Sequence, residues 1–321
     1  MIMLTRRNFM ALSAATLVTG AVPALARQLT TLGGGAFGSY WRLSVPQGID
    51  HDAVSISFSH IIAAVEQLFS PYRADSVLSQ FNRHDGTDWQ VVPDAFSTLV
   101  GQSLTLAQAC GGVFDPTVGP AVARQGFGPI SGVTGSFEEL AAQPGAARKR
   151  RGGLTVDLCG IAKGEALGRM AAALAQSGVT DYLLDLGGEV IARGQHPEGR
   201  GWQVGVEMPG GSGVAHILRL DDRTVATSGN SVQSYAHAGR SFGHIVDPAS
   251  GRAADTRLAS VSVLGRDPAL ADGWATAIAA AGVENGVALA EQRGLDALFL
   301  VREDDRLHSV FTGDFSSAVE V

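Results

Sequence analysis

Cysteine is scarce in this chain of 321 residues, and the scarcity excludes several kinds of site. The two cysteines, Cys110 and Cys159, stand far apart, and neither has a partner at the short spacing of a metal-binding motif. Two cysteines are too few for a disulfide framework, and isolated thiols do not build a zinc or iron–sulfur centre. The sequence therefore falls outside the disulfide-stapled and thiolate-metal classes.

Basic charge is also limited, because 24 lysines and arginines face 31 acidic residues and leave a formal net charge of −7. No long basic run follows the first few residues, which argues against nucleic acid as the main partner. Internal repeats and low-complexity segments are missing as well. With 45% hydrophobic and 17% charged residues, the composition is typical of a globular protein that can bury a real core.

A hydrophobic run long enough for a good membrane span is missing too, although a short one stands near the start. A twin-arginine pattern over residues 5–10 precedes an apolar run over residues 11–22, and Ala-Leu-Ala at residues 24–26 has the form of a cleavage site. No cysteine stands there to carry a lipid anchor. An uncleaved amphipathic anchor is the alternative. We predict a signal peptide over residues 1–26 and a mature chain from Arg27, exported to the periplasm by the twin-arginine route, with no integral membrane span.

Glycine, by contrast, is plentiful at 41 residues, and one glycine-containing stretch organises the chain. Residues 154–164, LTVDLCGIAKG, predict a short buried strand over residues 154–156, then Asp157, Gly160 and a helix that opens near Lys163. A helix N-terminus offers free N–H groups and a positive dipole end, and a glycine lets the backbone approach a ligand. These features suit a phosphate-bearing ligand and a metal. An ordinary strand–turn–helix with a solvated lysine is the alternative.

Apolar periodicity predicts an α+β fold of mixed, largely antiparallel sheets flanked by helices, because many strands follow one another after residue 180. No G-x-G-x-x-G follows a first strand, so a dinucleotide would not be held in the Rossmann manner. A basic loop over residues 148–151 is expected to be a solvated face. Helices are expected over residues 51–68, 75–82, 94–110, 136–142, 163–176, 267–281 and 283–292. Strands are expected over residues 37–43, 154–156, 181–185, 190–193, 202–207, 214–220, 224–230, 243–248, 258–264, 297–301 and 308–311.

Carboxylates at the ends of predicted elements indicate a metal site. Asp115 follows two apolar residues, Asp157 ends a predicted strand, and Asp272 stands four residues before Thr276, on the same face of a helix. Magnesium takes few protein oxygens and completes its shell with water and phosphate, and a backbone carbonyl near Gly160 would be a third ligand. An Asp-Pro turn and ordinary helix-surface polarity are the alternatives.

Eight short stretches, read in order, resemble the ApbE family of FAD:protein FMN transferases. They cover nearly all of the chain from residue 27 to residue 321, which the resemblance makes one flavin transferase domain. The N-terminal signal also resembles the NosX branch, whose members serve the maturation of nitrous oxide respiration. The stretches are FGSYW, SPYRADSVLSQFN, GGVFDPTVGP with GFG a few residues on, VDLCGIAKG, DLGGEV, ATSGN, HIVDPASG and ADGWATA.

The resemblance implies a role for each matched position. The FAD site would be lined by Phe37, Tyr72, Val113, Phe114 and Asp115. Asp157 and Lys163 would hold the dinucleotide, with Ile245 close to the flavin. Magnesium would be held by the Gly160 backbone, Asp272 and Thr276. Three positions of this chain differ from residues found in the family. Methionine is often found at the position of Phe37 and tryptophan at that of Gln125. Some members have a second aspartate at the position of Ala275.

The reaction so implied is transfer of FMN from FAD to a threonine or serine hydroxyl of a target flavoprotein, with Mg²⁺ neutralising the pyrophosphate and AMP as the leaving group. His244 is the candidate base for the acceptor hydroxyl, because the free pKa of histidine lies near working pH; a hydrogen-bonded core histidine is the alternative. The acceptor would be a periplasmic or membrane-bound flavoprotein, in the NosX branch one of nitrous oxide respiration. A Mg²⁺-dependent FAD pyrophosphatase and a non-enzymatic periplasmic FAD-binding or flavin-delivery protein remain as other hypotheses.

The signal peptide generates the first testable prediction. N-terminal sequencing of the exported protein should begin near Arg27, because the small-x-small motif ends at residue 26. Retention of Arg6 and Arg7 in the mature protein would contradict this.

Overall fold

The computed structural model of the protein describes residues 28–210, 212–229, 234–237, 240–243, 245–304 and 306–320, with only the backbone described for 234–237 and 240–243. The predicted signal peptide, Arg27 and His244 lie outside the described residues. No helix in the described part of the chain is long and apolar enough to cross a bilayer.

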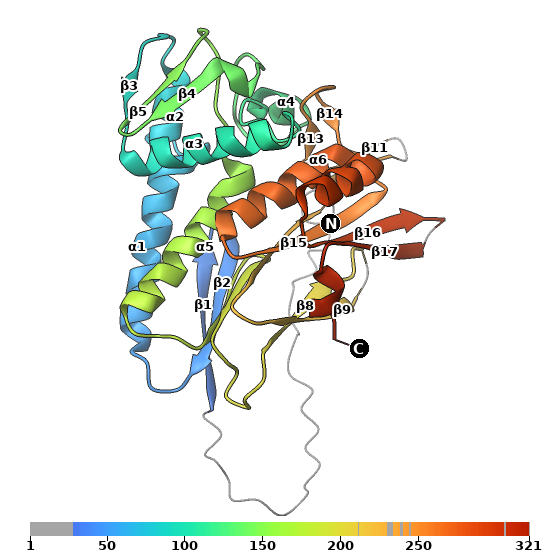
Figure 1. Ribbon diagram of the computed structural model, residues 1–321. Helices are drawn as coiled ribbons and strands as arrows, with labels where there is room; N and C mark the ends of the chain where they lie inside the picture. Colours follow the sequence, from blue (N-terminus) through green and yellow to red (C-terminus); the bar gives the residue numbers. More distant parts are fainter. Residues whose placement is uncertain are drawn as a thin grey trace, which may run out of the picture.

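An antiparallel sheet of eight strands forms the centre of the molecule (Figure 1). Every neighbouring pair runs antiparallel, in the order β1-β2-β6-β7-β10-β15-β16-β17. These strands are β1 (Leu29–Ala36), β2 (Ser39–Pro46), β6 (Tyr182–Leu186), β7 (Glu189–Arg193), β10 (Thr224–Gly229), β15 (Leu258–Gly265), β16 (Ala297–Glu303) and β17 (Arg306–Thr312). The prediction of largely antiparallel sheets is therefore confirmed.

Three long helices, α1 (His51–Phe69), α5 (Cys159–Gln176) and α6 (Pro268–Arg293), pack on one face of this sheet (Figure 1). The other face is covered by the hairpin of β8 (Trp202–Glu207) and β9 (Val214–Leu220) with the short helix η2 (Phe315–Ala318). Side chains alternate between the two faces of a strand, and consecutive residues of β15 and β16 are buried. Both faces of these two strands are therefore covered.

A smaller lobe is inserted between the adjacent strands β2 and β6 and forms the upper part of Figure 1. It consists of α2 (Val77–Arg83), α3 (Asp94–Ala109), α4 (Gly119–Arg124), η1 (Phe137–Glu139) and a sheet of β3 (Gln90–Val91), β5 (Ala146–Lys149) and β4 (Leu140–Gln143). Two further hairpins pair β11 (Ser234–His237) with β12 (Arg240–Gly243) and β13 (Val246–Asp247) with β14 (Arg252–Ala253).

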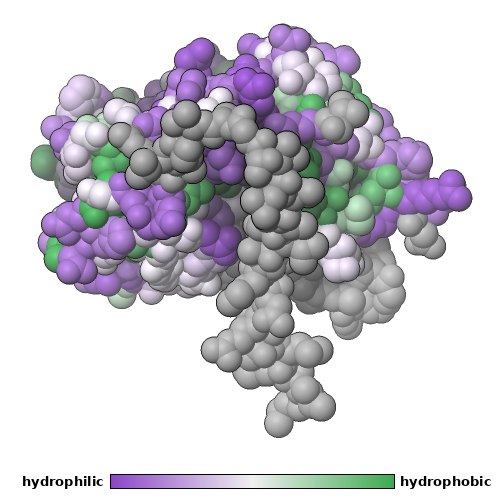
Figure 2. Space-filling model, turned by 90° about the horizontal axis from the view of Figure 1, so that it is seen from below, coloured by the Kyte–Doolittle hydropathy of each residue, from purple (hydrophilic) through white to green (hydrophobic). Residues whose placement is uncertain are grey.

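The face of the molecule shown in Figure 2 is mainly hydrophilic, with hydrophobic residues in small separate groups. Exposed apolar side chains such as Ile56 on α1 and Ile217 on β9 come from different elements. Such scattered exposure is normal for a globular surface.

Helices α5 and α6 pack closely, because three glycines of α5 lie at the contact. Gly160, Gly164 and Gly168 stand four residues apart and therefore share that face. A Cβ atom at Gly164 would lie 2.2 Å from the carbonyl oxygen of Pro268, and one at Gly160 would lie 2.8 Å from Cγ2 of Thr276. At Gly168 the nearest atom, Cγ of Pro268, would be 3.8 Å away. The helices run antiparallel and touch most tightly at Gly164.

The long helix α6 is broken at Gly282, whose φ of 78° and ψ of −168° are not helical. Residues before and after this glycine form two helical segments, so the predicted division into residues 267–281 and 283–292 is confirmed. Glycine is required there because its positive φ is strained for other residues.

Several local predictions are wrong, and three of them lie between residues 136 and 156. Residues 136–142 do not form one helix, because η1 ends at Glu139 and β4 begins at Leu140 and pairs with β5. Residues 154–156 are buried and extended but have a single bridge, from Leu154 to Val133, instead of a strand ladder. The basic segment 148–151 is not uniformly solvated, because Lys149 is fully buried.

The α5–α6 contact generates a second prediction. Gly164→Ala should lower the free energy of unfolding by about 3 kcal/mol, because its methyl group would overlap the backbone of α6. The matched control Gly168→Ala should stay within about 1 kcal/mol of wild type, since it has room and alanine favours a helix. Urea denaturation followed by circular dichroism measures both. Equal midpoints for the two variants would contradict the packing described.

Candidate functional site

The N-terminus of α5 is held where three parts of the chain meet. The backbone N–H of Asp157 donates to the carbonyl of Pro116 at 2.7 Å, which joins the segment before α5 to the loop before α4. Oδ1 of Asp157 accepts from the N–H of Cys159 at 2.9 Å and so satisfies one free donor of the first helical turn. The helix begins at Cys159, one turn earlier than the predicted opening near Lys163.

The three predicted magnesium ligands lie at the contact of α5 with α6. The hydroxyl of Thr276 donates to the carbonyl of Gly160 at 3.2 Å, and Oδ2 of Asp272 accepts from the N–H of Gly164 at 2.8 Å. Asp272 is buried, and Ser228 on β10 brings a further hydroxyl to 3.4 Å from that of Thr276. The carboxylate therefore meets α5 about one helical turn from the point where the hydroxyl meets the Gly160 carbonyl.

One lysine and two buried carboxyl groups lie beside these oxygens. Nζ of Lys163 lies 2.6 Å from Oε2 of Glu189, whose side chain is only 2% exposed. Burial alone would lower the pKa of Lys163, but the carboxylates of Glu189 and Asp272 together raise it above its ordinary value. One ammonium thus faces two buried carboxylates. The same burial raises the pKa of Glu189 to about 8, against the opposing effect of Lys163, and raises the pKa of Asp272.

The donor set fits a hard divalent cation. Magnesium binds through one or two carboxylates and other hard oxygens and keeps open positions for water and phosphate. Gly160, Asp272 and Thr276 supply such oxygens, and a cation bound there would favour the ionised form of the buried Asp272 carboxyl. No cluster of three or more His, Cys, Asp or Glu side chains suited to a metal occurs among the described residues.

The predicted flavin contacts of the lobe form part of the wall around Gly160. Phe114 is buried, and its ring edge would lie 3.2 Å from a Cβ atom at Gly160. Val113 packs against the apolar clusters beneath both helices. Both oxygens of Asp115 are engaged, Oδ1 by the N–H and hydroxyl of Thr117 and Oδ2 by the N–H of Phe137, so this carboxylate orders the loop. Burial raises the pKa of Asp115 despite these bonds.

Tyr72 extends from the lobe and is 71% exposed, so it does not cover the core. Burial of part of the ring, together with the side chains of Cys159 and Asp157, raises the pKa of its phenol. A largely exposed ring near the N-terminus of α5 is free to stack on a planar ligand.

Phe37 and Ile245 contribute to the two apolar clusters that Val113 also packs against. Phe37 occupies the turn between β1 and β2 at a φ of 50° and packs against the cluster beneath α1 and α5. Ile245 is buried in the cluster beneath α6. The contacts of the described residues join neither side chain to Asp157, and their flavin roles stay predictions, as does that of His244.

Sequence reasoning missed Glu189 and Ser228, although both stand in stretches that it matched. Glu189 follows the Gly187-Gly188 turn and opens β7, where an acidic residue before an apolar strand was the only signal. That signal does not show which face of the β6–β7 hairpin is buried, or that Lys163 faces Glu189.

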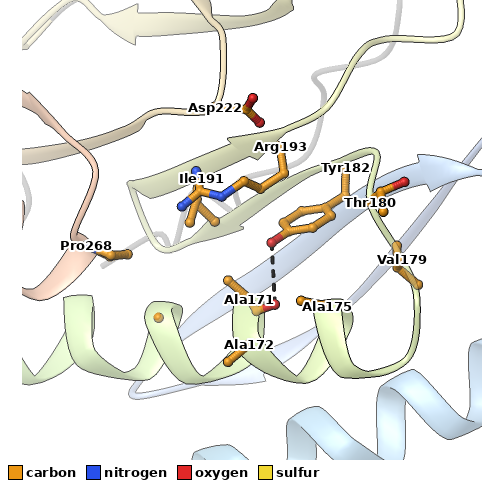
Figure 3. Close-up of a pocket in the computed structure, with 11 residues that line it drawn as sticks. Ala171, Ala172, Ala175, Val179, Thr180, Tyr182, Ile191, Arg193, Asp222 and Pro268 are labelled. Atoms are coloured by element: carbon orange, nitrogen blue, oxygen red, sulfur yellow. Dashed lines mark hydrogen bonds between the residues drawn. The ribbon is translucent and has the colours of Figure 1, made fainter.

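A separate hollow of about 440 Å³ lies at the other end of α5 (Figure 3). Its lining is mainly small and apolar, with Arg193 and Asp222 as the charged members, and the Tyr182 hydroxyl donates to the carbonyl of Ala171 beside it. None of the predicted site residues lines it. The hollow is therefore distinct from the candidate site.

Comparison with known proteins identifies the relatives of this chain. The ApbE family profile matches residues 37–299. The FAD:protein FMN transferase of Vibrio cholerae is 31% identical over 283 residues, covering 83% of this chain and 84% of the relative. That of Escherichia coli K12 is 28% identical over 315 residues, covering 91% and 90%.

Solved structures agree with these sequences. The flavin transferase ApbE from Vibrio cholerae has a TM-score of 0.82 at 29% identity and covers 91% of this chain and 99% of its own. The apo form of the flavinyl transferase ApbE from Pseudomonas stutzeri has a TM-score of 0.82 at 29% identity and covers 91% and 96%. The α+β fold expected from sequence is confirmed by these likenesses.

The buried pair generates a third prediction. Lys163→Met should lower the free energy of unfolding by about 3–5 kcal/mol, because it leaves Glu189 buried without its cation. In the unfolded chain the Glu189 carboxyl ionises near its ordinary pKa of 4.5, while burial holds the folded pKa far higher, so the free energy of unfolding of the variant should fall as pH rises above 4.5. The wild type, in which the pKa of Glu189 is about 8, should show the same fall up to about that pH. Chemical denaturation at pH 5 and pH 8 measures this.

Two controls make the result specific to the pair. The double variant Lys163→Met/Glu189→Gln should lose the part of the pH dependence that Glu189 causes and keep only that of the buried Asp272. Arg219→Met, which breaks an exposed pair with Asp221, should stay within about 1 kcal/mol of wild type. A Lys163→Met protein as stable at pH 8 as at pH 5 would contradict the assignment.

Proposed function

Because this chain belongs to the ApbE family, we propose that it transfers FMN from FAD to a threonine or serine hydroxyl of a target flavoprotein. The observation that carries the proposal is the contact of Asp272 and Thr276 on α6 with the first two turns of α5, where the Gly160 carbonyl and the half-buried Lys163 lie. The curated relatives that match most of the chain are FAD:protein FMN transferases, which supports the same activity.

Each part of the site has a task in this proposal. Lys163 and the free N–H groups at the start of α5 attract the pyrophosphate of FAD, and Asp157 orients the dinucleotide. Tyr72 and Phe114 border the planar part of the ligand. Gly160, Asp272 and Thr276 would hold Mg²⁺, which when bound neutralises phosphate charge and stabilises AMP as the leaving group.

The acceptor hydroxyl must lose a proton as it attacks the phosphorus. We propose His244 as the group that takes this proton, on the ground that a histidine titrates near working pH. The phosphoester bond then forms between the acceptor oxygen and FMN as the bond to AMP breaks. The acceptor is a periplasmic or membrane-bound flavoprotein, and the twin-arginine pattern at residues 5–10 supports export of the enzyme to the periplasm.

The metal site generates a fourth prediction. Asp272→Asn should bind FAD with an affinity close to that of wild type but transfer FMN at least about a hundredfold more slowly, because it removes the charged ligand of the metal that would stabilise the reacting phosphates. Asparagine keeps an oxygen for the N–H of Gly164, so the helix contact survives. Calorimetry with FAD and mass spectrometry of an acceptor domain measure the two quantities.

The controls separate transfer from its alternatives. Glu291→Gln removes an exposed carboxylate from the same helix and should leave transfer unchanged. Excess chelator should silence the wild type, and added magnesium should restore it. AMP release without flavin on the acceptor would instead favour a pyrophosphatase, and full transfer by Asp272→Asn would exclude this metal site.

A further inference from the structure

The segment that leads into α5 is buried without a strand partner along most of its length. Leu154, Val156 and Leu158 are fully buried, yet only Leu154 makes a bridge to another strand. Buried backbone N–H and C=O groups must find partners, since leaving one unpaired costs about 1–3 kcal/mol. The partners of Val156 therefore decide how this segment is held.

A single side chain from the lobe satisfies both polar groups of Val156. The Val156 N–H donates to Oδ1 of Asn82 at 2.7 Å, and Nδ2 of Asn82 donates to the Val156 carbonyl at 2.8 Å. This pairing imitates a strand neighbour and is made one residue before Asp157. Asn82 stands on α2, so the position of Asp157 depends on that short helix.

The far end of α2 anchors the loop that carries Tyr72. The fully buried hydroxyl of Ser76 caps α2 by accepting from the Ser79 N–H at 3.0 Å and donates to the carbonyl of Ser70 at 2.7 Å. One seven-residue helix thus connects, at its two ends, the loop of Tyr72 and the segment of Asp157.

The C-terminal end of α2 is itself fixed by a buried cation. Nζ of Lys149 donates to the carbonyls of Phe81 and Asn82 at 3.1 and 3.2 Å, which satisfies acceptors that a helix end leaves free. Lys149 is fully buried, and its burial lowers its pKa. A lysine placed this way has no surface role, and it holds the backbone of Asn82 in place.

We propose that Asn82 is a positioning residue of the flavin site, and that α2 sets the spacing between Tyr72 and Asp157 through its two ends. The inference rests on the proposed function, because it takes these two residues to bind the dinucleotide. A carboxamide is needed at residue 82, since it alone offers one donor and one acceptor side by side at this length. Aspartate would keep the shape but place an acceptor against the Val156 carbonyl.

The test compares FAD affinity with turnover in Asn82→Asp. Tyr72 and Asp157 would grip FAD equally before and during the reaction, so their displacement should raise KM for FAD about tenfold and leave kcat within about threefold. A merely structural role would lower the folded fraction, and so the apparent kcat, without raising KM. Arg83→Ala is the matched control, because this exposed residue of the same helix makes no hydrogen bond or ion pair among the described contacts.

Two further measurements keep the inference testable whatever the fate of one variant. Ser76→Ala removes the cap at the opposite end of α2 and should give the same rise in KM. This variant tests the inference even if Asn82→Asp does not fold. Amide hydrogen exchange at Val156, which needs no FAD, should be at least about tenfold faster in Asn82→Asp than in wild type.

The outcomes separate the inference from the proposed function. Wild-type protein that neither binds FAD nor transfers FMN would overturn the proposed function and the inference with it. Wild-type activity with an unchanged KM in folded Asn82→Asp, or with unchanged exchange at Val156, would overturn the inference alone.

Discussion

The close approach of α5 and α6 is the constraint on which the candidate site depends. Gly160 and Gly164 carry no side chains at the contact, so the backbone of α5 reaches the side chains of α6 directly. Thr276 then meets the carbonyl of Gly160, and Asp272 meets the N–H of Gly164. A larger residue at either glycine would push the helices apart, and the oxygens of the two helices would no longer share one place.

Burial of charge at this contact follows from the same geometry. Lys163 and Glu189 come from α5 and β7, and their ion pair lies next to the carboxylate of Asp272. Removing charges from water is costly, and a buried ion pair rarely stabilises a fold more than apolar residues would. The arrangement is therefore better explained by ligand binding, because an additional cation and an anionic ligand can balance the charges that the fold leaves unbalanced.

Features set by local pattern were predictable from the sequence, and features set by distant partners were not. The division of α6 was readable because Gly282 interrupts an apolar period, and Asp272 and Thr276 were readable as one helix face. Burial of Lys149 was not, because its partners are carbonyls of a helix far away in the chain. The extended segment before α5 has strand-like residues, yet Asn82 replaces the neighbouring strand that such residues usually find. Residues 136–142 have helical spacing, but from Leu140 onward they pair with β5, since tertiary contacts override a short local preference.

The pairing of β2 with β6 has a consequence for the order in which the protein can fold. Trp41 lies opposite Leu186, so the sheet closes only after the whole lobe between these strands has been synthesised. The entropy cost of closing a loop grows only slowly with its length, so the long insertion costs little stability. Pairing of strands that are distant in the sequence nevertheless slows folding. On the ribosome the hairpin of β1 and β2 therefore emerges with an unpaired strand edge, which is open to association with other chains until residues 182–186 arrive.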